Sequence, residues 1–199
     1  MNCDLACDEE KVIYKAKEIL NGLRQLFGYF DNSLVKEIKV ESPIIISYSS
    51  IIRGNYDYDS KTVTVNCING IICVETLIHE IIHSNGKYIY IKDRRTRMYI
   101  EGLTEFFTLY YLKKKLSYCL DHRFTDEICK INKDYEVYTT FWGNLALVVG
   151  INNLWDYYVR GEPNIDDLIK NDVFITFSKM EKMYKIKVKD LVDVITELQ

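Results

Sequence analysis

The sequence predicts an α+β fold with a small antiparallel or mixed sheet early in the chain and a mostly helical C-terminal half. Two β-branched runs, Ile44 to Ile52 and Thr62 to Val65, lie in the first third, and apolar residues recur at helical spacing on both sides of them. Strands and helices that are segregated along a chain are typical of α+β domains. At 199 residues, 48% of them hydrophobic, the chain suits one domain with a sizeable core.

The first expected element is an amphipathic helix from Asp8 to Phe30, with apolar residues every three or four positions. A β-hairpin, or two neighbouring strands, follows, with a turn in the polar stretch from Gly54 to Ser60. Further helices are expected at Cys73 to Asn85, Arg97 to Lys115, Tyr135 to Val149, Asn153 to Arg160, Ile165 to Asn171, Ile175 to Tyr184 and Lys187 to Leu198.

The expected domain organisation is a single domain over residues 1–199, because no linker or repeat interrupts the chain. Within it, residues 1–85 form a lobe with the sheet and one central helix, and residues 86–199 form a helical lobe. Gly150 is expected to end the third long helix as a left-handed cap.

Charge and cysteine content limit the partners and the compartment. A net charge of −3 and a pI near 5.7 give no overall attraction to phosphate, so we expect neither a nucleic acid nor a membrane as partner. The six scattered cysteines predict reduced, mostly buried thiols, since a chain of this length folds without cross-links. Cys3 and Cys7 are expected at a frayed terminus, with half of a metal site as the alternative. These thiols and the lack of a visible leader favour the cytoplasm, and secretion stays open.

Residues 79–83 have the sequence HEIIH and hold two of the three histidines of the chain. On a helix, His79 and His83 point the same way while the apolar residues around them occupy the other side. Two neutral imidazoles one turn apart bind one Zn²⁺, and Glu80 reaches a water in the open position of the metal. Such a pair arises by chance in roughly one such sequence in a thousand, so an ordinary helix is the weaker interpretation.

Two glutamates follow on the next expected helix, where residues 101–105 have the sequence EGLTE. Glu101 and Glu105 lie one turn apart on an otherwise apolar helix, and burial of both carboxylates is costly unless a positive group meets them. Zinc and a zinc-bound histidine would provide that charge, with Glu101 as third ligand and Glu105 accepting the free N–H of a ligand imidazole. A solvated face with two glutamates is the alternative.

HEIIH followed by EGLTE resembles the gluzincins, the thermolysin-like zinc metallopeptidases, over about Thr62 to Leu112. The resemblance implies a zincin-like fold with one zinc ion per chain on His79, His83 and Glu101. It implies that Glu80 is the general base on a zinc-bound water and that Glu105 orients His79. It also implies that a peptide or protein substrate pairs, as an extended strand, with the strand at residues 61–66. The chain lacks the calcium-site acidic clusters of thermolysin and is far shorter, so the substrate range does not transfer.

Hydrolysis of a peptide bond also requires a donor to the developing oxyanion, which gluzincins take from a tyrosine or histidine. Tyr135 is the first candidate because it opens the helix most similar to the downstream helix of the family, and Tyr138 and His122 are in reserve. The sequence thus predicts a zinc metallopeptidase of unknown oligomeric state. An intracellular protease acting on a specific repressor or partner, a zinc-binding regulatory or interaction protein without turnover, and a metal-free interaction module stay open.

Overall fold

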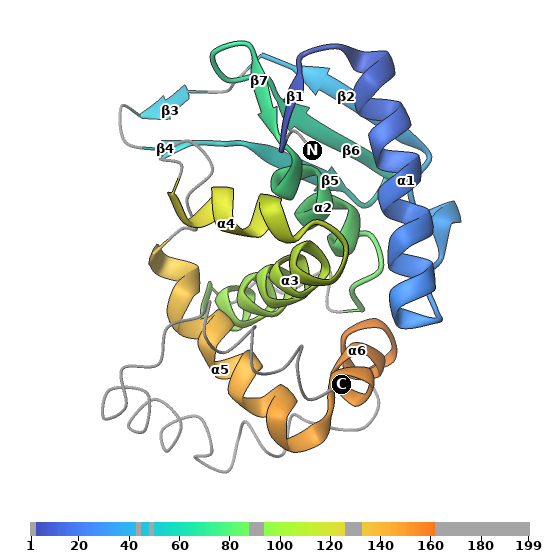
Figure 1. Ribbon diagram of the computed structural model, residues 1–199, viewed down its shortest axis with the longest axis vertical. Coiled ribbons are helices and arrows are strands. Elements are labelled where there is room, and N and C mark those ends of the chain that lie inside the picture. The colour runs from blue at the N-terminus through green and yellow to red at the C-terminus, as the bar shows by residue number, and fades with distance from the viewer. Residues whose placement is uncertain (1–2, 43–44, 48–49, 88–93, 126–132, 162–199) are drawn as a thin grey trace. The chain divides into compact units, whose positions relative to one another are not determined.

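The computed structural model describes residues 3–42, 45–47, 50–87, 94–125 and 133–161 (Figure 1). The chain divides into two compact units, one of residues 1–85 and 115–130 and the other of residues 86–114 and 131–199. The α+β class is confirmed, and the expectation that the whole chain is one domain stays a prediction. In the described ranges, no helix is long and apolar enough to cross a bilayer.

The first unit carries short strands and the helices that cover them. Its elements are β1 (Asp4–Ala6), α1 (Glu9–Phe27), the 3-10 helix η1 (Asn32–Leu34), β2 (Glu37–Glu41), β3 (Ile45–Ser47), β4 (Ser50–Ile51), β5 (Gly54–Asp57), β6 (Thr62–Asn66), β7 (Ile71–Cys73), α2 (Val74–His83) and α4 (Ser117–Thr125).

The main sheet has the order β2-β6-β5, with β2 parallel and β5 antiparallel to β6. The predicted hairpin turn is therefore wrong in position, because Gly54–Asp57 is a strand and the turn occupies residues 58–61. There Asp57 accepts hydrogen bonds from the backbone N–H and the hydroxyl of Ser60, and Lys61 has a φ of 59°. The first β-branched run does not pair with β6, because β3 and β4 within it pair with each other.

Helix α1 confirms the first expected helix and lies against β2 and α2. The Asp8 carboxylate accepts a hydrogen bond from the backbone N–H of Lys11, which stabilises the start of the helix and lowers the pKa of that carboxyl. The buried side follows the apolar spacing of the sequence: Val12, Ala16, Ile19, Leu20 and Leu23. Gly28, with a φ of 76°, ends it.

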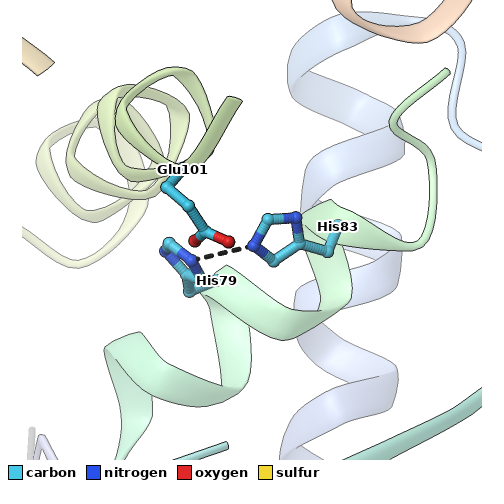
Figure 2. Close-up of side chains that lie close together, drawn as sticks. All are labelled: His79, His83 and Glu101. Carbon is cyan, nitrogen blue, oxygen red and sulfur yellow. Dashed lines mark hydrogen bonds between the residues drawn. The ribbon is translucent and has the colours of Figure 1, made fainter. Parts of the chain in front are cut away.

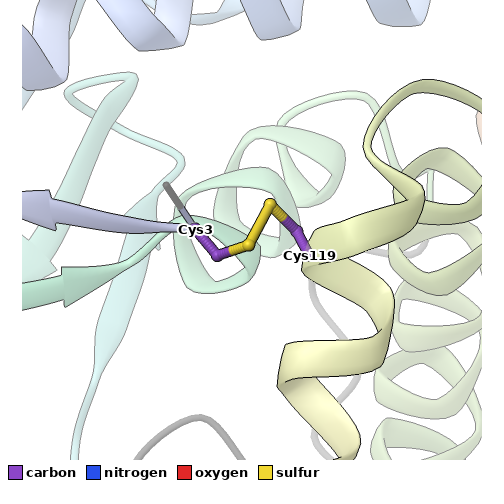
Figure 3. The surroundings of a disulfide bond; sticks show 2 residues. All are labelled: Cys3 and Cys119. Atoms are coloured by element: carbon purple, nitrogen blue, oxygen red, sulfur yellow. A yellow bond between two sulfur atoms is a disulfide. The ribbon is translucent and has the colours of Figure 1, made fainter. Parts of the chain in front are cut away.

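The cysteines overturn the prediction of reduced thiols. Disulfides join Cys3 to Cys119 and Cys7 to Cys67, and Cys73 is disulfide-bonded as well. The Cα atoms lie 5.1 Å apart in the first pair and 5.6 Å in the second, within the range that a disulfide spans. Figure 3 shows the first bridge between the N-terminal segment and α4. Cys3 is 2% exposed, so neither a frayed end nor half of a metal site describes these residues.

The second unit contains α3 (Arg94–Lys115), α5 (Lys133–Val149) and α6 (Ile151–Arg160), which confirm three of the expected helices. Large aromatic side chains fill its core, and Trp142 and Tyr158 also form hydrogen bonds. Trp142 Nε1 donates to the Tyr99 carbonyl at 2.7 Å, and the hydroxyls of Thr104 and Tyr158 lie 2.9 Å apart. Gly150 lies between α5 and α6 as expected, but the predicted left-handed cap is wrong in its conformation, because a φ of 84° is combined with a ψ of 147°. The last three expected helices lie outside the described residues.

Candidate metal centre

Helix α2, which carries HEIIH, is fixed at both ends. Its first residue, Val74, donates its backbone N–H to the Cys3 carbonyl at 3.2 Å, because β1 pairs with β7 immediately before the helix. At the other end, the Ser84 hydroxyl donates to the Ile81 carbonyl at 2.6 Å, and Asn85 accepts the Asp31 N–H at 2.7 Å. A helix of ten residues has little stability of its own, so these contacts hold it in place.

The apolar side of α2 packs into the core of the first unit. Its residues Leu77, Ile78, Ile81 and Ile82 are all 0% exposed. The helix contacts α1, β5 and β6, which is the arrangement that the apolar spacing predicts. The polar side chains of the motif are almost as buried: His79 is 8% exposed, Glu80 9% and His83 8%.

The two histidines bring the same ring nitrogen toward a common point. Their Nε2 atoms lie 3.0 Å apart and their rings cross at 75°. Two nitrogen ligands of a tetrahedral zinc, each at about 2.05 Å from the metal, lie about 3.3 Å apart. A hydrogen bond between the two rings requires one neutral, unprotonated Nε2, and this is also the form that binds a metal. The pair thus requires little movement to become a two-ligand site.

Glu101 of α3 completes the group. One ring nitrogen of each histidine and one carboxylate oxygen of Glu101 all lie within 4.8 Å of one another (Figure 2). Two imidazoles and a carboxylate are a donor set that catalytic zinc sites use, so these residues fit the metal. The same residues also take part in salt bridges, which proteins form without any metal. The three predicted ligands are therefore together, and zinc on them stays a prediction.

Glu80 points at strand β5. A Cβ placed on Gly54 of this strand would lie 2.8 Å from Glu80 Cγ and 3.1 Å from Glu80 Oε1. Gly54 therefore belongs to the surroundings of the motif, although the sequence indicated only a turn residue. The sequence does hold a signal for Gly54: a glycine within a run of strand-forming residues often marks a place where another group approaches the backbone closely.

For the other predicted site residues, the structure gives burial and neighbours but no distance to the two histidines. Glu105 is 1% exposed on α3 beside Thr104 and Thr108, so the solvated face is wrong for it, and its orienting role stays a prediction. Tyr135 lies in the first turn of α5, and its contribution to hydrolysis is likewise untested. Tyr138 packs its ring against Tyr99, with the ring centroids 4.9 Å apart. The reserve candidate His122 has its side chain outside the described residues.

The predicted substrate strand is wrong in its position. Residues 61–66 correspond to β6, and both edges of β6 are hydrogen-bonded, to β2 on one side and to β5 on the other. An additional strand cannot pair with β6 because its backbone groups are already used. Among the described strands, β5 pairs with β6 alone and lies directly against α2.

No protein-family model, curated protein or solved structure matches this chain. The likeness to the gluzincins therefore consists of the HEIIH and EGLTE segments and of the side chains that they bring together.

Proposed function

We propose that this protein is a zinc metallopeptidase with a zincin-like fold, of the type that the gluzincins represent. One observation carries the proposal: the opposed Nε2 atoms of His79 and His83, 3.0 Å apart, with a Glu101 oxygen within 4.8 Å. The burial of all three polar residues of HEIIH supports it, because a low-polarity surrounding strengthens electrostatic interactions in a reacting site.

Each of the site residues has a separate role in the proposed hydrolysis. His79, His83 and Glu101 would hold the zinc ion, which would act as a Lewis acid and lower the pKa of a water. Glu80, adjacent to a ligand but not itself one, takes the proton of the attacking water and returns it to the leaving nitrogen. Glu105 accepts the second ring N–H of His79 and fixes its orientation. Tyr135 donates to the oxyanion.

The proposed substrate is an extended peptide or protein segment that adds to the edge of β5 that no other described strand pairs with. This edge replaces the one expected at residues 61–66, and it lies against the helix that carries Glu80. Backbone hydrogen bonds would supply affinity for many sequences, and the side chains around the edge would supply selectivity.

A zinc-binding protein without turnover is the second candidate. The near-complete burial of the histidines and their salt bridges favour it, because a buried and already paired site is also suited to a structural metal. An intracellular protease acting on one repressor or partner is less well supported. Disulfides persist in oxidising compartments, so we propose an extracytoplasmic location in place of the cytoplasm.

Hydrolysis of a mixed peptide library, followed by mass spectrometry, separates these candidates. Wild-type protein loaded with zinc should cleave peptides, and Glu80→Gln should bind the same amount of zinc and lose cleavage. His83→Ala is the matched control that should lose both. Cleavage retained in Glu80→Gln would refute the assigned mechanism, and zinc binding with no cleavage by the wild type would favour the second candidate. Glu105→Ala should reduce zinc affinity or activity about 10–100-fold.

A further inference from the structure

Gly54 occupies a place where no other residue fits without movement. It is the first residue of β5 and pairs with Val65 of β6. A Cβ at this position would lie 2.8 Å from Glu80 Cγ and 2.8 Å from Thr76 Cγ2. Both distances are shorter than the 3.0 Å below which real Cβ atoms are essentially never found.

The backbone conformation is not what requires glycine here. Gly54 lies outside the positive-φ region, unlike Gly28 and Gly70. An alanine could adopt the same extended conformation and would normally favour a strand, since glycine loses the most conformational freedom on folding. The close approach of α2 is therefore the remaining reason for a glycine.

The neighbours that a new methyl group would meet differ in how easily they move. Strand β5 is held by its pairing with β6, and the Asn66 N–H donates to the carbonyl of Arg53 at 2.7 Å, one residue before Gly54. Thr76 is 8% exposed and β-branched, so its side chain is stiff. The Glu80 side chain has more rotatable bonds, and its carboxylate would move first.

We infer that Gly54 is a positioning residue: it lets β5 lie against α2 and thereby sets where the Glu80 carboxylate lies. The inference rests on the proposed function, in which Glu80 is the general base. A general base has to lie within hydrogen-bond reach of the proton that it takes. Misplacement by about 1 Å lowers a rate by about 100-fold.

Gly54→Ala in the zinc-loaded chain of residues 1–199 tests this. The turnover number should fall about 100-fold with KM unchanged, because the substrate still binds while the base is displaced. The zinc content should stay at the wild-type value, since the three atoms nearest to the new methyl group belong to Glu80 and Thr76 and not to the ligands. Asn55→Ala, one residue further on the exposed face of the same strand, is the matched control and should leave zinc content and stability unchanged.

A rescue variant separates positioning from general damage. Thr76→Ser removes Cγ2 and keeps the hydroxyl, so the methyl group introduced by Gly54→Ala can shift away from Glu80. Gly54→Ala/Thr76→Ser should regain a large part of the lost turnover. Equal turnover in the single and double variants, or an equal loss of zinc, would overturn the inference.

A stability measurement tests the contact without any substrate. Gly54→Ala should lower the urea midpoint of the wild type and lower it much less in a Glu80→Ala background, where Cγ is absent. The same decrease in both backgrounds would overturn the inference. The urea midpoints can show that Gly54→Ala acts through Glu80 while the wild type shows no Glu80-dependent cleavage. In that case the proposed function and the positioning role are both refuted, but the packing of Gly54 against Glu80 is supported.

Discussion

Removal of the disulfide between Cys3 and Cys119 should lower the stability of the first unit by an amount that follows from its place in the chain. The two residues are 116 positions apart, and loops of about 100 residues correspond to about 4.7 kcal/mol in the chain-entropy description. The disulfide between Cys7 and Cys67 already bridges 60 of those positions, which leaves a loop of about 56 residues and about 4 kcal/mol. Disulfides typically stabilise a protein by about 2–4 kcal/mol, so we expect a loss in the range of about 2–4 kcal/mol.

The same change should reach the candidate metal centre. The carbonyl of Cys3 accepts the Val74 N–H at the start of α2, and β1, only three residues long, is tied by a disulfide on each side. When the disulfide at Cys3 is absent, β1 is tied by a disulfide only on its Cys7 side, so the Cys3 carbonyl is held less firmly and the first turn of α2 loses its hydrogen-bond acceptor more often. Zinc affinity should therefore fall together with stability.

The assay is urea unfolding of Cys3→Ala/Cys119→Ala without reductant, followed by circular dichroism, with zinc titration on the same samples. Both cysteines are 2% exposed, so alanine keeps the site apolar. Added reductant is the control, because it should remove most of the difference between wild type and variant. Equal free energies of unfolding without reductant, when mass spectrometry shows the disulfide in the wild type, would refute the reasoning.

Three further changes have definite expected outcomes. Glu101→Ala should weaken zinc binding by at least about 10-fold in a competition titration, and an unchanged affinity would assign the third ligand elsewhere. Gly102→Ala should lower the free energy of unfolding by about 1–3 kcal/mol, because the new Cβ would overlap Tyr138 Cβ and lie 2.8 Å from the backbone of that residue; an unchanged thermal midpoint would contradict this. Asp57→Asn should destabilise the protein at pH 7, since the bonds from Ser60 lower the pKa of that carboxyl. The ionised carboxyl contributes to folding stability at pH values above its ordinary pKa of 3.8. This contribution is lost as the pH falls through the lower pKa of the folded state, so the urea midpoints of wild type and variant should differ at pH 7 and converge in acid.

The helices were predictable because their signal is local. The apolar spacing in residues 8–30 and the polar residue Asp8 before it define α1 almost to its ends, and α2, α3 and α5 follow from the same pattern. The strands were harder because pairing joins residues that are distant in the sequence. β2 pairs in parallel with β6, and β1 pairs with β7, which follows it by more than 60 residues. Neither pairing has a local signature in the sequence.

The site was predictable for a similar reason, and only in part. His79 and His83 are one turn apart, so their proximity follows from helix geometry alone. Glu101 was identified through the cost of burying a carboxylate and through a family resemblance, and its oxygen does lie near the histidines. Gly54 and the disulfides could not be derived, because a close approach or a cross-link depends on the tertiary fold.

The most direct test of the central claim is the zinc content per chain, measured by elemental mass spectrometry on protein purified without added metal or metal-affinity resin. His79→Ala/His83→Ala, prepared in the same way, is the matched control. We expect about one zinc ion per wild-type chain and none in the variant. No zinc in the wild type and none taken up on titration, or the same content in both proteins, would contradict the assignment of His79, His83 and Glu101 as a zinc site.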